Sequence, residues 1–432
     1  MGPGKDRISI GSKKKIAFVC SGGASKAGAF HLGVALALQE QGFRFFGGVA
    51  TPGGKPHVPA PMEIGTYVGS SAGSMICAML AAGYSLENIF NSFRGKVSDD
   101  PVDNIPKPLT PLTYTKMLKL RTGIAREQLE QLLFIKQMLG AVAKGDWESL
   151  IQMKWMKFTG LFSTSGIEEY MRDDVLPSNS FKDYPADLFI PATQLNHSRK
   201  VVFGKYRYQP PPHDLTCQYD NDVSISQAVA ASTALPFIFS PYPIQNPDGT
   251  KTFYIDGEVR ETLSTHVAVD AGADLIIASY THQPVHLKKE LGSLTEHGLP
   301  AILIQSIYLL VEQKINNHVH SKKIQRNAID AVHQYCKQQG VSEEHRKRII
   351  EILEAEMHHR RDVDSIYVHP SPADATMFHG EHFSLSAKRM QDYVRAGFRA
   401  GIDTLRRYQF ADQDKKPRTL ESSISKSGAG EI

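Results

Sequence analysis

The chain has 432 residues, of which 41% are apolar and 22% are charged, and its net charge is +4. This composition excludes collagen-like and wholly disordered proteins, and the length allows one large α/β core or two smaller ones. The charge is too small to indicate nucleic-acid binding, so we expect no nucleic acid among the partners.

The cysteines and the apolar runs bear on the compartment. The four cysteines, Cys20, Cys77, Cys217 and Cys336, form no C-x-x-C pair, which favours a reducing compartment over a disulfide framework. Three lysines precede only five apolar residues at 16–20, which predicts a buried strand and not an export signal. Residues 299–311 are too short to span a bilayer. We expect a cytoplasmic or peripheral membrane protein.

The predicted elements start after a loose arm at residues 1–12. A strand at 16–20, a glycine loop and a helix at 27–38 form the unit that opens many α/β sheets. Prolines and glycines at 51–61 predict a surface excursion. A second strand at 64–68 leads through a tight turn into a helix of small residues at 74–82, which Gly83 ends.

Four further strands are predicted at 188–192, 200–203, 253–255 and 275–279, with helical patterns between several of them. This order indicates a mainly parallel, covered sheet.

Two helix-rich regions, 105–160 and 285–360, interrupt or follow this core. The first contains both tryptophans, Trp147 and Trp155, beside basic residues. This composition suits a lid or a membrane-facing surface, and the alternative is a helix packed on its own domain.

A candidate nucleophile lies in the turn Gly69-Ser70-Ser71-Ala72-Gly73, which matches G-x-S-x-G between a predicted strand and a predicted helix. Gly69 and Gly73 allow the flanking backbones to approach while the Ser71 hydroxyl projects from the edge of the sheet. The alternative is a Gly-Ser turn that matches by chance.

A candidate oxyanion loop follows the first strand, at residues 21–28. Backbone N–H groups of such a loop stabilise the negative oxygen of a tetrahedral intermediate, and we assign Gly22, Gly23, Ala24 and Lys26 to it. The alternative is a phosphate or dinucleotide loop, which fits less well because the glycine spacing is not G-x-G-x-x-G.

A candidate base, Asp256, follows a predicted strand and precedes Gly257. Catalytic residues of open α/β sheets gather at this edge, although an Asp-Gly pair is more often only a turn. A free Asp, with a pKa of about 3.9, is a weak base at neutral pH, so burial has to raise its pKa or hydrogen bonding has to make the transfer concerted.

Two histidine pairs, His318 with His320 and His358 with His359, raise the question of a metal site. Neither pair has a ligand spacing with a supporting acid. We therefore interpret them as solvated helix faces and expect no metal and no cofactor.

Taken together, these segments resemble the patatin-like phospholipases. The glycine loop is similar to the oxyanion loop of that family, the serine turn to its nucleophile elbow, and Asp256-Gly257 to its catalytic Asp-Gly motif. The stretches at 28–33, 192–196 and 230–236 also resemble the family, with a fainter likeness at 383–401.

The resemblance implies an α/β, three-layer patatin-like fold with a mainly parallel central sheet, a helical insertion and a helical C-terminal extension. It implies a catalytic domain over 14–280 with the insertion at about 105–160, a helix-rich extension over 281–410 and a flexible tail over 411–432. The implied chemistry is a Ser-Asp dyad, in which Ser71 forms an acyl-enzyme and Asp256 is the base. The implied partners are phospholipids, lysophospholipids or neutral acylglycerols, met by transient contact with a membrane surface.

The chain departs from the family pattern at three positions. Ala27 is an extra residue between Lys26 and Gly28, and Ala24 stands where a third glycine is usual. Glu258 follows Gly257, where the family more often has Gly or Ala. A second carboxylate here either raises the pKa of Asp256 or faces solvent.

Two other functions stay open from the sequence. One is an α/β-hydrolase esterase with a Ser-Asp-His triad, for which His266 or His282 follows Asp256 in the required chain order. The other is a non-catalytic lipid-binding protein that keeps the fold, since a fold does not guarantee activity.

Overall fold

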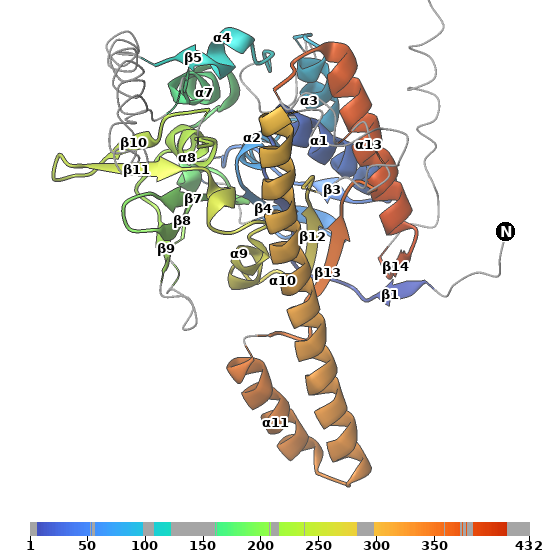
Figure 1. Ribbon diagram of the computed structural model, residues 1–432. Coiled ribbons are helices and arrows are strands. Elements are labelled where there is room, and N and C mark those ends of the chain that lie inside the picture. Colours follow the sequence, from blue (N-terminus) through green and yellow to red (C-terminus); the bar gives the residue numbers. More distant parts are fainter. Residues whose placement is uncertain are drawn as a thin grey trace, which may run out of the picture.

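The protein is described from a computed structural model (Figure 1). The described residues are 7–412 outside the following gaps: 52, 54–56, 98–107, 122–159, 161, 207, 209–215, 237, 283–297, 358, 372–373, 375–376 and 378–382. Most of the predicted insertion at 105–160, with Trp147 and Trp155, lies outside the described residues, as does most of the predicted tail.

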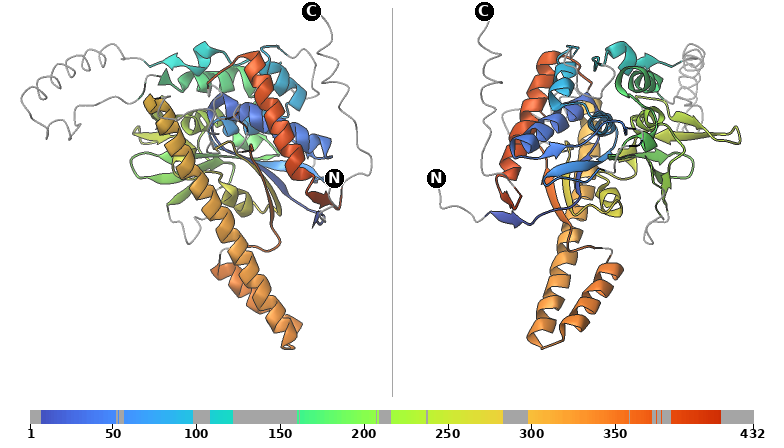
Figure 2. Two further views of the ribbon diagram at one scale, coloured as in Figure 1. Left: turned by 45° about the vertical axis from the view of Figure 1, so that its right-hand side comes forward. Right: turned by 180° about the vertical axis from the view of Figure 1, so that it is seen from behind.

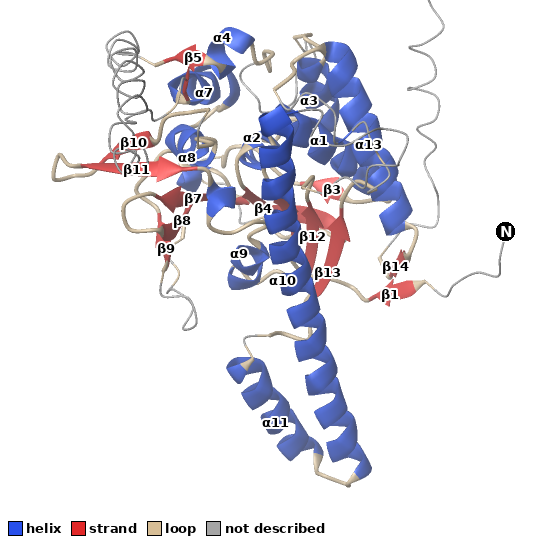
Figure 3. Ribbon diagram, viewed as in Figure 1, coloured by secondary structure: helices blue, strands red, loops and turns tan. Residues whose placement is uncertain are grey.

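A ten-stranded sheet forms the centre of the molecule (Figure 3). Its main order is β10 (Tyr242–Gln245), β11 (Lys251–Ile255), β7 (Asp187–Gln194), β4 (Glu63–Gly69), β2 (Ile16–Cys20), β12 (Leu275–Ser279) and β13 (Asp364–Val368). Three strands lie off this path: β3 (Arg44–Phe45), β8 (Arg199–Gly204) and β9 (Cys217–Asp220).

The middle of the sheet is parallel. Strands β7, β4, β2, β12 and β13 pair in parallel, whereas β7 pairs antiparallel with β8 and β11. Every residue of β2 and β12 is buried, as expected of parallel strands that are covered on both faces. The predicted mainly parallel sheet is confirmed.

Helices cover both faces of the sheet. Alternate residues of a strand point to opposite faces, so neighbouring residues of β2 belong to different apolar clusters. Ile16, Phe18 and Cys20 belong to one apolar cluster with α1 (Ala24–Glu40), α2 (Ala72–Ala81), α8 (Ile225–Ser232) and α13 (Ala387–Leu405). Ala17 and Val19 belong to a second cluster with α9 (Thr265–Asp270) and α10 (Gly298–Gln338). The predicted three-layer α/β arrangement follows from these two clusters.

Helices α1 and α13 lie side by side on the first face (Figures 1 and 2). A Cβ added at Gly33 would lie 2.0 Å from the Val394 carbonyl oxygen, and one at Gly397 would lie 2.0 Å from the Phe30 carbonyl oxygen. Glycine at both positions therefore permits the close packing of the two helices. It places a C-terminal helix directly on the helix that follows the glycine loop.

Several shorter described elements flank this core. They are α3 (Leu86–Phe93), α4 (Tyr114–Met117), β5 (Lys119–Leu120), β6 (Phe162–Ser163), α7 (Ser165–Tyr170), a π-helical turn at Met171–Val175, and 3₁₀ turns at Phe181–Asp183 and Gly257–Val259.

The helical C-terminal extension is seen in part. Helix α10 packs Val311 and Ile315 into the second apolar cluster, and its far end contacts α11 (Glu343–Glu356). This two-helix hairpin projects from the body (Figure 2). Strand β13 and helix α13, which lie beyond residue 280, belong to the central sheet and to its first helical layer. The domain boundaries stay a prediction.

The predicted loose arm at residues 1–12 is wrong for residues 8–10. Strand β1 (Ile8–Ile10) pairs in parallel with β14 (Tyr408–Phe410). Ile10 and Phe410 are buried, so apolar contact with the body holds a segment whose local sequence is that of a loop.

Within the described residues, no helix combines the length and the apolar character needed to cross a membrane.

Candidate active site

The turn between β4 and α2 holds Ser71 in an unusual backbone conformation, with φ 52° and ψ −126°. Such a conformation is strained for a residue with a Cβ and persists only where its surroundings enforce it. A Cβ at Gly69 would lie 2.4 Å from the Gly73 carbonyl oxygen, and one at Gly73 would lie 2.5 Å from the Cys20 carbonyl oxygen. Both elbow glycines are therefore required by close backbone approach.

The Ser71 backbone is tethered to helix α8. Its N–H donates to Ser232 Oγ at 2.9 Å, and the Ser232 hydroxyl donates to the Pro191 carbonyl at 2.6 Å. All of these groups are buried. The sequence did not indicate a role for Ser232, and the only signal was its place in the stretch 230–236 that resembles the family.

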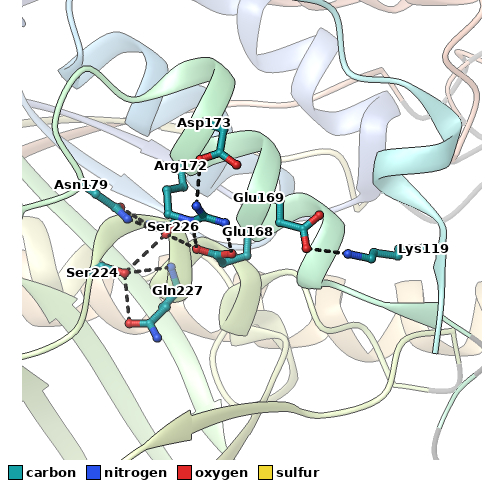
Figure 4. Close-up of polar contacts among 9 residues, drawn as sticks. All are labelled: Lys119, Glu168, Glu169, Arg172, Asp173, Asn179, Ser224, Ser226 and Gln227. Carbon is teal, nitrogen blue, oxygen red and sulfur yellow. Dashed lines mark hydrogen bonds and ion pairs between the residues drawn. The ribbon is translucent and has the colours of Figure 1, made fainter. Parts of the chain in front are cut away.

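Polar contacts at the opposite end of α8 hold that helix in place (Figure 4). Ser226, in its first turn, accepts a hydrogen bond from Asn179 Nδ2 at 2.8 Å and donates to Glu168 Oε1 at 2.8 Å. Glu168 also pairs with Arg172 at 3.0 Å. The helix that carries Ser232 is thus fixed to α7 and to the turn that follows it.

Asp256 follows β11 and is 2% exposed. Its Oδ1 accepts a hydrogen bond from the Glu258 backbone at 2.9 Å, and its carboxyl group faces the Ser71 hydroxyl within hydrogen-bonding reach. Burial raises the pKa of Asp256 to about 6, against the opposing effect of the hydrogen bonds from Ser71 and from the Glu258 backbone. Asp256 is therefore ionised at neutral pH and is a stronger base than a free Asp.

The glycine loop lies against the serine. A Cβ at Gly22 would lie 2.9 Å from Ser71 Cβ and 3.5 Å from Ser71 Oγ. Gly23 has φ 130° and is the N-cap of α1, and Ala24 has φ 57°. The N-terminus of α1 carries the partial positive charge of the helix dipole, and Gly23 at the N-cap has no side chain that would cover it.

Lys26 is fully buried, and its Nζ donates to the Met377 carbonyl at 2.6 Å. Burial lowers the pKa of Lys26 to about 7. The ammonium group is thus held by the segment before α13. The assignment of Lys26 to the oxyanion loop stays a prediction.

The two histidines considered for a triad lie in different places: His266 lies beside Glu261, and His282 lies beside Gly23, where a Cβ added to that glycine would be 3.9 Å from His282 Cε1. His266 Nδ1 lies 2.9 Å from Glu261 Oε1, and Glu261 also pairs with Lys200. Burial, together with the charges of Lys26 and His31, lowers the pKa of His282 to about 3. The carboxyl group that these histidines would need, Asp256, is engaged instead with Ser71 and the Glu258 backbone.

No metal centre is evident in the described part of the chain, where His, Cys, Asp and Glu side chains form no group of three or more with ligand geometry. His318 Nε2 lies 3.1 Å from Thr265 Oγ1, which ties α10 to α9.

The glycine loop, the serine turn and Asp256 are far apart in the sequence but meet at one point. A comparison with protein families identifies the family to which the chain belongs. The model of the patatin-like phospholipase family matches residues 18–269. The chain belongs to the patatin-like phospholipase family. This membership confirms the resemblance inferred from the sequence and makes the protein a lipid ester hydrolase in general terms. No curated protein matches the chain.

Proposed function

We propose that this patatin-like phospholipase hydrolyses carboxylic esters of glycerolipids, as a phospholipase A or lysophospholipase, with Ser71 as nucleophile and Asp256 as base. The observation that carries the proposal is the buried pair itself, in which the Ser71 hydroxyl faces an Asp256 carboxylate of raised pKa. A nucleophile and a base within hydrogen-bonding reach are the requirement of covalent acyl transfer.

In the first half-reaction, Ser71 Oγ attacks the ester carbonyl carbon while its proton passes to Asp256. The carbonyl oxygen becomes an oxyanion and accepts hydrogen bonds from the amides of the loop Gly22, Gly23 and Ala24. Collapse of this intermediate breaks the C–O bond of the ester. Asp256 returns the proton to the leaving alcohol.

In the second half-reaction, a water molecule attacks the acyl-enzyme and Asp256 accepts its proton. The tetrahedral intermediate collapses, the fatty acid leaves, and Ser71 Oγ recovers the proton. The strained φ of Ser71 and the hydrogen bond from its backbone N–H to Ser232 Oγ hold the Ser71 hydroxyl in the same place for both steps.

The proposal is tested with purified protein and a short-chain fluorogenic ester, followed by analysis of the products from phospholipid, lysophospholipid and diacylglycerol. We expect Ser71→Ala and Asp256→Asn each to lower kcat by about 10³-fold or more. We also expect a fluorophosphonate to label Ser71, as read by peptide mass.

The chain offers a matched control in a second Asp-Gly pair, Asp248-Gly249. It lies in the turn between β10 and β11, where Asp248 Oδ1 accepts a hydrogen bond from the Thr250 backbone at 2.9 Å. Asp248→Asn should leave kcat unchanged. Full activity of Ser71→Ala, or liposome binding by a wild-type protein that neither hydrolyses esters nor takes the label, would refute the proposal.

A further inference from the structure

His31 connects the glycine loop to the end of β12. It lies in α1, and its side chain is fully buried. Its Nε2 lies 2.9 Å from the Ser21 carbonyl oxygen, and its Nδ1 lies 2.7 Å from Ser279 Oγ. Because a carbonyl oxygen accepts hydrogen bonds and has none to donate, Nε2 carries the proton and donates to Ser21.

Burial keeps this ring neutral. It lowers the pKa of His31 to about 4, against the opposing effect of the hydrogen bond with the Ser21 backbone. The neutral ring has one N–H and one acceptor nitrogen, so Nδ1 accepts a hydrogen bond from the Ser279 hydroxyl. Ser279 thereby fixes the tautomer in which His31 donates to the loop.

The next carbonyl groups of the loop are held as well. The Gly22 carbonyl oxygen accepts hydrogen bonds from Thr281 Oγ1 at 3.2 Å and from Ser21 Oγ at 3.1 Å. The Gly23 carbonyl oxygen accepts one from the Ala27 N–H at 3.3 Å. Three consecutive peptide units therefore have fixed carbonyl directions.

These carbonyl groups determine where the amides of the loop point. A peptide unit is planar and trans, so its N–H points away from its C=O. Strand β2, which leads into the loop, lies between β12 and β4. Thr281 follows β12, and Ser279, which sets the tautomer of His31, ends it. Ser71 follows β4. The amides of the loop are therefore directed away from β12, to the side on which the nucleophile lies.

The position of the Gly22 amide agrees with this direction. It lies near the Glu258 carboxyl group and favours its ionised form, and a Cβ at Gly22 would lie 2.8 Å from Glu258 Cγ and 2.9 Å from Ser71 Cβ. Each Glu258 carboxyl oxygen has less than 1 Å² accessible, so solvent exposure, one of the two outcomes that the sequence left open for this group, is wrong. Gly22 is buried beside it, whereas Gly23 and Ala24 are partly exposed. The loop is therefore open to a substrate at Gly23 and Ala24.

We propose that His31 and Thr281 are positioning residues, which hold two carbonyl groups of the loop so that the Gly23 amide faces the substrate oxyanion. The inference rests on the proposed function. Neither side chain touches the substrate. Their effect is to fix the loop before the substrate arrives, so that the amide does not have to reorient while negative charge develops on the carbonyl oxygen.

Paired variants test each residue. Thr281→Val removes the hydroxyl and keeps the shape, whereas Thr281→Ser keeps the hydroxyl. His31→Leu removes both hydrogen bonds, whereas His31→Gln keeps an N–H for the Ser21 carbonyl and an oxygen for the Ser279 hydroxyl. Thr66→Val is the matched control, because Thr66 is buried in β4 and its hydroxyl lacks a hydrogen bond.

The measurement is kcat and KM on a soluble ester and on the matching thionoester, in which sulfur replaces the carbonyl oxygen. Sulfur is a weak hydrogen-bond acceptor, so an amide directed at the oxyanion accelerates the ester more than the thionoester. We expect His31→Leu to lower kcat on the ester about 10²-fold with little change in KM. Thr281→Val should lower it about 10-fold, because Ser21 Oγ remains on the same carbonyl. The ratio of ester to thionoester kcat should fall in both variants, and His31→Gln and Thr281→Ser should regain most of the lost kcat and the wild-type ratio.

Damage to the fold as a whole would lower kcat on both substrates by the same factor, and an unchanged ratio would overturn the inference. A Thr281→Val variant with the kcat and ratio of Thr66→Val would also overturn it, and this comparison remains if His31→Leu does not fold. A wild-type protein that neither hydrolyses esters nor takes the fluorophosphonate would overturn the proposed function and this inference together.

Discussion

Replacing Ser232 by alanine tests how the nucleophile is held. The Ser232 hydroxyl accepts the Ser71 N–H at 2.9 Å and donates to the Pro191 carbonyl at 2.6 Å. Alanine removes both hydrogen bonds and leaves a buried amide without its acceptor. An unsatisfied buried group costs about 1–3 kcal/mol, so we expect the free energy of unfolding to fall by about 2–4 kcal/mol.

The same change should lower activity. Ser71 keeps its φ of 52° only while its surroundings enforce it. The hydrogen bond from the Ser71 backbone N–H to Ser232 Oγ is one of those constraints. Release of the amide lets Ser71 relax and moves its hydroxyl away from Asp256. A displacement of about 1 Å at a reacting atom costs about 10²-fold, so kcat on a soluble ester should fall by about that factor.

Unfolding in urea and steady-state kinetics at pH 7 measure the two effects. Ser264→Ala is the matched control, because Ser264 is buried and its hydroxyl lacks a hydrogen bond. That variant should show nearly wild-type stability and kcat. Ser232→Ala with the same stability and kcat as this control would show that the tether does not hold the nucleophile.

Three further predictions concern the glycines, the base and Glu258. Gly73→Ala should lower the free energy of unfolding by about 1–3 kcal/mol, because its Cβ would meet backbone oxygens of Cys20 and Ser21 at 2.5 and 2.6 Å. Gly28→Ala, whose nearest contact would be 3.8 Å, should not destabilise the protein, and equal losses in both would refute the steric explanation. Since the pKa of Asp256 is raised to about 6, kcat/KM should fall about tenfold per pH unit below that value, and activity that stays level down to pH 4 would exclude Asp256 as the base. Glu258 has a pKa of about 8 when folded against 4.5 otherwise, so it destabilises the fold fully above pH 8 and not at all below pH 4.5. The stability gained by Glu258→Gln should therefore increase between these values by up to about 1.4 kcal/mol per pH unit, and a gain independent of pH would contradict the buried neutral acid.

Local patterns in the sequence were sufficient for much of the core. The strands at 16–20, 64–68 and 275–279 are observed as β2, β4 and β12, because a short, largely apolar run that is bounded by turn-forming or polar residues favours a buried strand. The helix predicted at 27–38 is longer, from Ala24 to Glu40. Helix propensity does not reveal that a glycine loop continues directly into the first turn, with Ala24 at a positive φ.

Contacts between distant segments were not predictable in the same way. Residues 8–10 read as part of a loose arm, yet they form β1 because β14, near the other end of the chain, supplies the partner strand. Ser232 gave no sign of its bond to the Ser71 amide, since a serine in a helix of small residues is ordinary in isolation.

The sequence by itself determined the family and the chemical candidates, since the glycine loop, the serine turn and the Asp-Gly pair are each local patterns in a characteristic order. Only the tertiary structure decided that Ser71 and Asp256 face each other, and that the carboxyl group of Glu258 turns inward to the loop. The reason is that hydrogen bonding and pKa depend on burial and on neighbours brought from other strands. Neither property is encoded within a few residues of chain.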